Sequence, residues 1–396
     1  MSSQAAATGG LGVWITGTGA VSCVGIGAQA LWQSTLENHS GLEAGLGRVP
    51  VQARSSSTQH NSPALEFALP AAREALSDAG WPSLEPGDGL ILASTTGQIS
   101  NWESALIDFI RGKRTRTDVA PTLRRLPLGS LLTDLQRELN HVGPATLVSS
   151  SCAAATQALG LAALWLQSGK VERCLVGGVE VLCDLTIHGF RCLQLLASGP
   201  CAPFSSDKGG IQLSEGAAFL CLQNKRPMAE RPIRLSGVGF STDAYHMTAP
   251  HPQGEGSRAA MAQALASAGL QPQQIDWVHA HGTGSVHNDA AEAAAIGQLF
   301  GVGAAAPWVS ATKPIHGHTL GASGTLEAVV CVHALHHQML LPTFGLNQPD
   351  PALQLRHPTQ AQRAQLRHVL KNTLGFGGAN AALVLSAEEG LVHGHA

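Results

Sequence analysis

The chain has 396 residues, of which 44% are hydrophobic and 13% charged, and its formal net charge is −3. This composition is typical of a globular protein with a large core, and the lack of a long basic run argues against a nucleic-acid-binding surface. No apolar run is long enough to span a membrane and the first ten residues do not resemble a secretory signal, so we expect a cytoplasmic protein with reduced cysteines.

The chain is predicted to be an internal duplication, because the same order of elements occurs twice. In each half a strand runs into a glycine-rich turn, an alanine-rich helix ends at glycine, a second strand follows, and a small-residue helix comes later. In the first half these elements occupy residues 12–22, 71–80, 89–94 and the stretch after Ser151. In the second half they occupy residues 233–243, 260–269, 275–280 and the stretch after Gly321. Strands that alternate with helices predict α/β units with buried parallel strands.

We expect the two halves, residues 1–229 and 230–396, to pack into one body with the active site between them. The segment 98–141 interrupts the pattern of the first half, and we interpret it as an insertion. It carries a cluster of basic residues, namely Arg111, Lys113, Arg114, Arg116, Arg124 and Arg125. Such a cluster is either a solvated face or a docking surface for an acidic partner, and both interpretations stay open.

Cys152 stands in the sequence SSSCAAA, between the predicted strand 145–148 and an apolar helix. A cysteine at a helix N-terminus lies near unpaired backbone N–H groups and the positive end of the helix dipole, and both favour the thiolate. The pattern therefore predicts a nucleophile whose pKa is lowered. A buried structural cysteine is the alternative, and it is the interpretation we give to the other seven cysteines.

Three motifs of the second half are rich in glycine and polar residues. Residues 279–285 (HAHGTGS) follow a predicted strand, and their imidazole and hydroxyl groups can donate to a carbonyl oxygen or bind a carboxylate. Residues 313–324 (KPIHGHTLGASG) lead into a helix that carries Glu327. Residues 375–380 (GFGGAN) form a loop that can aim backbone N–H groups at an oxyanion.

Other common site motifs are missing from the sequence. The glycine-rich segment 17–22 lacks the last glycine of a dinucleotide fingerprint, and no Walker lysine follows it. No CxxC pair and no HExxH motif occurs, so we expect no metal site and no nucleotide cofactor.

Together, the four motifs resemble the elongating β-ketoacyl-acyl-carrier-protein synthases of the thiolase superfamily. The cysteine elbow, HGTG, K-x-x-x-G-H with GAxG, and GFGG-x-N occur in the family's order over nearly the whole chain. Further matches are ITGTGAVS near the N-terminus, Pro203-Phe204 and Glu215-Gly216-Ala217. The resemblance implies an α/β thiolase fold, with two pseudo-duplicated βα halves in a five-layered α-β-α-β-α arrangement. Thiolases use a second cysteine, and initiating synthases an asparagine where this sequence has His318, so the Cys-His-His set resembles the elongating class.

The resemblance also implies the reaction: decarboxylative Claisen condensation of a cysteine-bound acyl group with malonyl-acyl carrier protein, without any cofactor beyond the carrier's phosphopantetheine. Cys152 would hold the acyl group, and His281 and His318 would stabilise the enolate. The other implied roles are a charge network (Lys313, Glu327), an oxyanion donor and gate (Phe376), contact with the malonyl carboxylate (Thr283, Ser285) and docking of the acidic carrier protein (Arg124, Arg125, Arg191).

Some features depart from the family's usual pattern. The segment from Phe190 to Phe204 is short, Ser285 stands where threonine is commoner, and His316 is unusual beside His318. These departures indicate a specialised pathway, such as aryl-polyene or other polyketide pigment synthesis, rather than housekeeping fatty-acid synthesis. Two alternatives stay open: a non-catalytic subunit that resembles chain-length factors, and a coenzyme A-dependent, thiolase-like acyltransferase. We expect a dimer, either with itself or with a related subunit.

Overall fold

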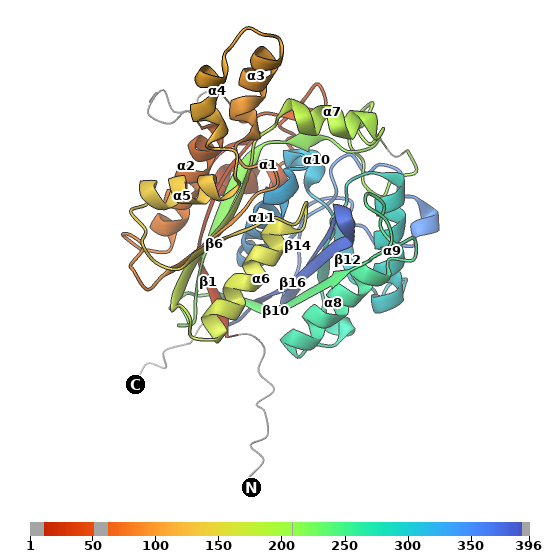
Figure 1. Cartoon of the computed structure of the whole chain (residues 1–396). Coiled ribbons are helices and arrows are strands. Elements are labelled where there is room, and N and C mark those ends of the chain that lie inside the picture. The colour runs from red at the N-terminus through yellow and green to blue at the C-terminus, as the bar shows by residue number, and fades with distance from the viewer. Residues whose placement is uncertain (1–11, 51–61, 208, 390–396) are drawn as a thin grey trace, which may run out of the picture.

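The computed structural model describes residues 12–50, 62–207 and 209–389, and these form an eleven-stranded sheet in two related halves (Figure 1). In each half two parallel pairs of strands are followed by antiparallel neighbours. The first half has the order β6 (Ala145–Val148), β5 (Gly89–Ala93), β7 (Arg173–Glu180), β9 (Gly216–Gln223), β1 (Val13–Ser22). The second has the order β12 (Trp308–Ser310), β11 (Trp277–His279), β15 (His368–Gly375), β16 (Ala379–Ala387), β10 (Ile233–Thr242). The halves join where the first residues of β1 and β10 pair, and the eleventh strand, β2 (Gly25–Ile26), pairs with the last residues of β1.

Helices cover both outer faces of the sheet and fill the space between its halves. The central layer is α6 (Ala154–Gln167) and α11 (Ser323–His337), which share one buried core with strands of both halves. The outer layers are α2 (Pro63–Asp78) on the first half and α8 (Glu255–Ala268) with α9 (Val286–Phe300) on the second. The predicted five-layered α/β fold with two related halves is therefore confirmed. The boundary at residues 229 and 230 falls in the loop between β9 and β10 and stays a prediction.

Glycines in the first strand of each half explain how the outer helices come so close. A Cβ atom on Gly19 in β1 would lie 2.1 Å from the carbonyl oxygen of Ala71 in α2. A Cβ atom on Gly239 in β10 would lie 2.0 Å from the carbonyl oxygen of Ala260 in α8. The glycines that we expected to form a turn therefore lie inside the strands β1 and β10, and they serve helix–sheet packing because only glycine allows this backbone contact.

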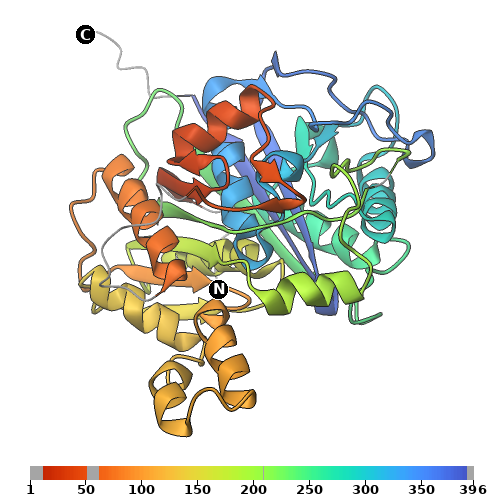
Figure 2. The ribbon, with the colours of Figure 1, turned by 90° about the horizontal axis from the view of Figure 1, so that it is seen from above.

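The predicted insertion is a helical excursion made of α3 (Ile99–Ile110), α4 (Arg116–Leu123) and α5 (Gly129–Glu138). Its first two helices project from the body of the molecule (Figure 2). The remaining elements are α1 (Ala28–Leu36), α7 (Asp184–Cys192), α10 (Lys313–His316), the short strands β2 (Gly25–Ile26), β3 (Leu42–Glu43), β4 (Leu46–Gly47), β8 (Leu213–Ser214), β13 (Met339–Leu340) and β14 (Gln362–Arg363), and the 3₁₀ turns η2 (Pro272–Gln274), η3 (Leu320–Ala322), η4 (Pro351–Leu353) and η5 (Phe376–Gly378). No helix in the described part of the chain is both long and apolar enough to cross a bilayer.

Candidate active site

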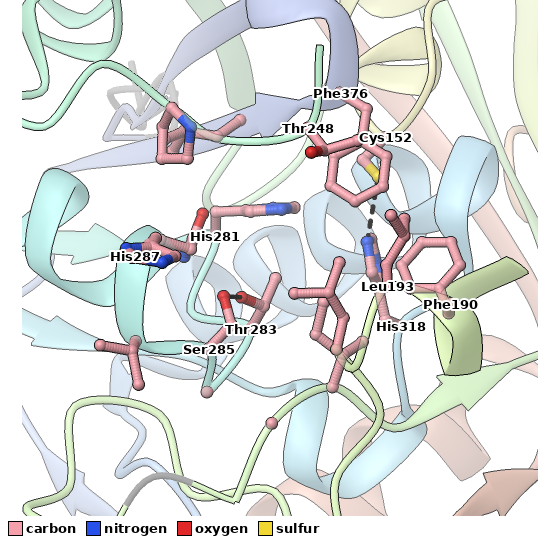
Figure 3. Close-up of a pocket in the computed structure, with 18 of the residues that line it drawn as sticks. Cys152, Phe190, Leu193, Thr248, His281, Thr283, Ser285, His287, His318 and Phe376 are labelled. Atoms are coloured by element: carbon pink, nitrogen blue, oxygen red, sulfur yellow. Dashed lines mark hydrogen bonds between the residues drawn. The ribbon is translucent and has the colours of Figure 1, made fainter. Parts of the chain in front are cut away.

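The chemically active motifs meet where strands of both halves end. Cys152 lies between β6 and α6, His281 follows β11, His318 follows α10, and Phe376 follows β15 directly. Parallel strands place their carboxyl ends at one edge of a sheet, which is why motifs far apart in the sequence converge here. The four residues line a cavity of about 400 Å³ (Figure 3).

Cys152 and the two histidines form a compact set on the cavity wall. The Nε2 atom of His318 lies 3.1 Å from the sulfur of Cys152. The rings of His281 and His318 are 5.3 Å apart and nearly perpendicular, at 83°. All three side chains are buried, the most exposed being Cys152 at 6%. Ser151 before the cysteine has a φ of 48°, so a left-handed elbow turns the sulfur towards the histidines.

Lys313 determines which nitrogen of His281 carries the proton. Its ammonium contacts the backbone oxygen of His281 at 2.6 Å, the Nδ1 atom of the same residue at 3.2 Å, and the carboxylate of Glu327. An ammonium group only donates, so Nδ1 must accept and the ring proton must be on Nε2. Burial, followed by the charge of Lys313, holds the pKa of both His281 and His318 well below its ordinary value. His281 is therefore a neutral donor.

The Nδ1 atom of His318 has a different partner, the hydroxyl of Ser323, at 2.8 Å. A hydroxyl group both donates and accepts, so His318 can carry its proton on either nitrogen. It can therefore accept a proton from Cys152 or donate a hydrogen bond to a substrate oxygen.

The pKa of Cys152 differs from the sequence-based prediction. Burial raises the pKa of its thiol to about 12, although Lys313 and the backbone N–H groups of Phe376 and Cys152 act in the opposite direction. The predicted lowering of the Cys152 pKa is therefore wrong. Removal of the sulfur from water destabilises the thiolate more than the backbone N–H groups and Lys313 stabilise it.

Phe376 packs against an aromatic ring that the sequence did not single out. Its ring stacks on Phe190 of α7, with centroids 5.4 Å apart and planes at 15°. The loop that carries Phe376 is tied down by Asn380, which donates to Asp243 at 2.7 Å, and by the N–H of Gly377, which donates to the backbone oxygen of Met247 at 2.7 Å. Figure 3 shows Phe190 and Phe376 beside Cys152. The two rings therefore close the cavity on the cysteine side.

Two buried carboxylates of α9 hold the turn that follows His281. Glu292 accepts from the backbone N–H of His281 at 2.6 Å and of Gly282 at 2.9 Å. Asp289 accepts from the N–H of Gly284 at 3.2 Å and of Phe204 at 2.8 Å. The sequence analysis missed both residues. Their only local signal is an acidic residue on the buried face of a helix that directly follows the motif.

The two hydroxyls of the same turn face one another across 3.1 Å, between Thr283 and Ser285. Both residues line the cavity, and their contact with a substrate carboxylate stays a prediction (Figure 3).

His316 belongs to a second, separate histidine pair. The hydroxyl of Thr312 lies 2.9 Å from Nε2 of His279 and 2.9 Å from Nε2 of His316, and Nδ1 of His316 lies 2.9 Å from the oxygen of Gly317. Since that carbonyl only accepts, His316 is protonated on Nδ1, Thr312 donates to it, and His279 donates to Thr312. Burial lowers the pKa of His279 to about 3 and that of His316 to about 4, so both imidazoles in this row of hydrogen bonds are neutral. The hydrogen bond between Thr312 and His316 joins the residue before α10 to the last residue of that helix.

The three arginines predicted to dock a carrier protein do not lie together at the cavity. Arg191 is exposed and directly follows Phe190, which lines the cavity. Arg124 and Arg125 follow α4, and no residue of the excursion 98–141 is among those that line the cavity.

The Cys152, His281 and His318 ligand atoms lie within 4.8 Å of one another, a spacing that a zinc ion could also use. A dication would have to lie beside His281, whose second ring nitrogen already accepts from a lysine ammonium. That positive charge disfavours a metal and favours an anion at the same place.

Comparisons with known proteins agree with this geometry. Residues 51–227 match the family model "Beta-ketoacyl synthase, N-terminal domain" and residues 233–347 match "Beta-ketoacyl synthase, C-terminal domain". The chain is 30% identical to the 3-oxoacyl-[acyl-carrier-protein] synthase 2 of Staphylococcus aureus (strain N315), over 95% of this chain and 98% of that one.

Two solved structures are also similar. The ishigamide ketosynthase/chain length factor superposes with a TM-score of 0.85 at 29% identity, over 94% of this chain and 98% of that chain. A type II polyketide ketosynthase, solved with its acyl-carrier protein and bound to a hexaketide, superposes with a TM-score of 0.85 at 25% identity, over 95% and 99%.

Proposed function

The chain belongs to the β-ketoacyl synthase family and is a condensing enzyme of the acyltransferase class, and from this premise we propose that Cys152, His281 and His318 are its catalytic residues. The observation that carries the proposal is the 3.1 Å contact between Cys152 and His318, with the Nε2–H of His281 in the same cavity. A non-catalytic subunit would need neither a nucleophile nor two histidines beside it.

The first half-reaction loads an acyl group onto the enzyme. The sulfur of Cys152 attacks the thioester carbonyl of an acyl group on the phosphopantetheine of a carrier protein. His318 takes the thiol proton and passes it to the departing phosphopantetheine sulfur, so one C–S bond forms and one breaks. The N–H groups of Cys152 and Phe376 stabilise the oxyanion, a contribution that typically accelerates acyl transfer by about 100- to 1000-fold per donor. The high pKa of the resting thiol makes this proton acceptor necessary.

The second half-reaction uses both histidines as donors. The malonyl thioester carbonyl lies against the Nε2–H groups of His281 and His318, and Thr283 and Ser285 meet the carboxylate. Loss of CO₂ leaves the electron pair in an enolate that the two histidines stabilise. The carbanion attacks the acyl carbonyl, the C–S bond to Cys152 breaks, and the thiolate takes a proton from solvent. CO₂ release drives the sequence, and no step calls for a redox cofactor or a metal.

The function is tested by exposing the protein to a panel of acyl- and malonyl-carrier proteins and measuring intact mass and labelled CO₂ in parallel. We expect an acyl adduct, CO₂ release and a β-ketoacyl product. Acylation by coenzyme A thioesters alone, without CO₂ release from malonyl-carrier protein, would favour the thiolase-like alternative. Absence of both reactions would favour a subunit without activity.

The acyl group is proposed to be apolar and to belong to a polyketide-type pathway. The cysteine side of the cavity is lined by Phe190, Leu193, Leu195, Leu196 and Ile211. Ketosynthases of polyketide type superpose closely on the chain, but the Staphylococcus synthase is at least as similar in sequence, so aryl-polyene synthesis stays a prediction. Including aromatic and polyene-type starters beside saturated ones in the same panel distinguishes these pathways, because a strong preference for saturated chains would contradict the proposal.

A partner subunit is proposed at the free edge of the sheet. Strand β6 pairs only with β5 among the described strands, although its sequence ATLV is largely apolar. In the helical excursion that precedes β6, Ile107, Phe109 and Ile110 of α3 are exposed by 39%, 39% and 73%. Unpaired edges and apolar patches of this kind are normally covered, and the ishigamide structure pairs a ketosynthase with a chain length factor.

Light scattering should find a dimer, or a stable complex with a related subunit. Ile110→Glu should weaken the assembly, whereas Val302→Glu, which changes another exposed aliphatic residue, in the other half of the chain, should not. A monodisperse, active monomer would contradict the proposal.

Docking of the acidic carrier protein is proposed to use Arg191 at the cavity, with support from Arg124 and Arg125. Charge patches steer association and are weakened by salt. Arg191→Glu should raise the Michaelis constant for carrier-linked substrate and leave that for a small soluble thioester unchanged. Equal loss with both substrates would show that the arginine has a structural role instead.

A further inference from the structure

Lys371 is a second buried lysine next to the catalytic cluster, and none of the four motifs contains it. It lies on β15, in the sequence HVLKNTLG, and is 0% exposed. A lysine with no exposed surface needs partners for its charge, because an unpaired buried ammonium is very costly.

The ammonium of Lys371 has three partners, all buried. Its Nζ lies 3.0 Å from Oε2 of Glu327, an ion pair, and 3.0 Å from the hydroxyl of Thr156, and it also donates to the hydroxyl of Thr373. Thr156 lies on α6, the helix that Cys152 precedes. Lys371 therefore links the helix of the nucleophile to the carboxylate behind the histidines.

Glu327 is consequently shared by two lysines, one on each oxygen. Lys313 holds Oε1 and Lys371 holds Oε2. Burial acts to raise the pKa of Glu327, but Lys313 and Lys371 outweigh it, and the pKa lies well below its ordinary value. Glu327 therefore remains an acceptor only.

Because Glu327 is shared by two lysines, the contact of Lys371 determines which acceptors the three N–H groups of Lys313 meet. With Oε2 occupied by Lys371, Lys313 binds a single carboxylate oxygen and has two protons left for the backbone oxygen and Nδ1 of His281. Without Lys371, the free Oε2 would either draw Lys313 into a two-oxygen contact or take up a proton. Both changes would release Nδ1 of His281 and allow the tautomer that has no Nε2–H.

We propose that Lys371 is a positioning residue for decarboxylation: by occupying Oε2 of Glu327, it keeps Lys313 on His281 and so keeps the His281 proton on Nε2, facing the substrate. The inference rests on the proposed function, since it assigns the enolate to His281. The other buried carboxylate near this turn, Glu292, accepts three N–H donors of its own, from His281, Gly282 and Asn372, and does not compete for Lys371.

The test is Lys371→Met, assayed separately for CO₂ release from malonyl-carrier protein and for Cys152 acylation. Misplacement of a catalytic group by 1 Å can cost about 100-fold, and we expect a fall of up to about that size in the kcat of CO₂ release, because the variant misplaces the His281 proton without removing the ring. KM for malonyl-carrier protein and the rate of acylation should stay close to those of the wild type. Cys331→Ala, one helical turn beyond Glu327 and equally buried, controls for disturbance of the core and should leave CO₂ release unchanged.

A double-mutant cycle with Glu327→Gln isolates the mechanism. If Lys371 acts through the carboxylate, Lys371→Met should not lower CO₂ release further in the Glu327→Gln background. The same fold-loss in both backgrounds, or a parallel loss of acylation, would overturn the proposal.

If Lys371→Met alone fails to fold, the double variant, which has one buried ammonium and no buried carboxylate at this place, is compared with Glu327→Gln: equal CO₂ release supports action through the carboxylate, and a further loss overturns the proposal. A wild-type protein that neither acylates nor releases CO₂ would instead refute the proposed function itself.

Discussion

Replacement of His281 by alanine and replacement of His318 by alanine are expected to affect CO₂ release and Cys152 acylation differently. Both histidines line the cavity, but the Nε2 atom of His318 lies 3.1 Å from the sulfur of Cys152, whereas His281 is hydrogen-bonded to Lys313 and makes no hydrogen bond to the cysteine. His281→Ala should therefore remove one enolate donor and spare acylation. His318→Ala should remove a donor and also the acceptor of the thiol proton.

The size of the effect follows from the hydrogen bonds that are lost. Removal of one preorganised oxyanion donor costs about 100- to 1000-fold in turnover, or about 3–4 kcal/mol. We expect His281→Ala to lower CO₂ release by this factor while Cys152 acylation continues. For His318→Ala we expect a similar loss of CO₂ release and, in addition, slower acylation, because burial raises the pKa of the thiol to about 12 and its proton acceptor is gone.

The assay follows labelled CO₂ and covalent acylation in parallel for both variants, with Cys152→Gln and His336→Ala for comparison. Cys152→Gln should release CO₂ without condensing, since its amide can occupy the acyl position. His336, exposed on α11, is outside the site, and its loss should change neither reaction. If His318→Ala releases CO₂ at the wild-type rate, or if His281→Ala slows acylation as much as CO₂ release, the assignment of roles is wrong.

Three further predictions concern the nucleophile, the loop behind His281 and the packing of the fold. Peptide mapping after acyl transfer should locate the adduct on Cys152, and an adduct that survives Cys152→Ala would contradict this. Burial raises the pKa of Asp289 to about 7, so the folded chain keeps a proton that the unfolded chain releases near pH 3.8. The free energy of unfolding of the wild type relative to Asp289→Asn should therefore fall as the pH rises from about 4 to about 7 and then level off, and a difference that rises with pH would refute the argument. Gly19→Ala should destabilise the fold by about 1–3 kcal/mol in thermal or denaturant unfolding, because its Cβ would lie 2.1 Å from the oxygen of Ala71. Gly87→Ala, where nothing lies within 4 Å of the added Cβ, is the control and should leave stability nearly unchanged.

Much of the architecture could be predicted because it depends on short-range patterns. Alanine-rich runs that end at glycine located the later turns of α2 and α8, whose first turns begin earlier than predicted, and the repeated order of elements indicated two related halves. The residues Cys152, His281 and His318 could be singled out because each lies in a motif that is continuous in the sequence, and because together they resemble one family. Local patterns of this kind survive without knowledge of the tertiary fold.

Tertiary structure decided the properties that sum over distant residues. The pKa of Cys152 rises because the whole cavity wall removes its sulfur from water, a cost that the local helix start does not reveal. Phe190 and Phe376 stack across the cavity, and Lys371 meets Glu327 from a different strand. The sequence did contain one sign of the contact between Lys371 and Glu327, a lysine in the middle of a strand. The partner of Lys371, Glu327 on α11, could be identified only from the packing of β15 against α11, because a buried charge is stabilised by contacts in space and not by neighbours in the chain.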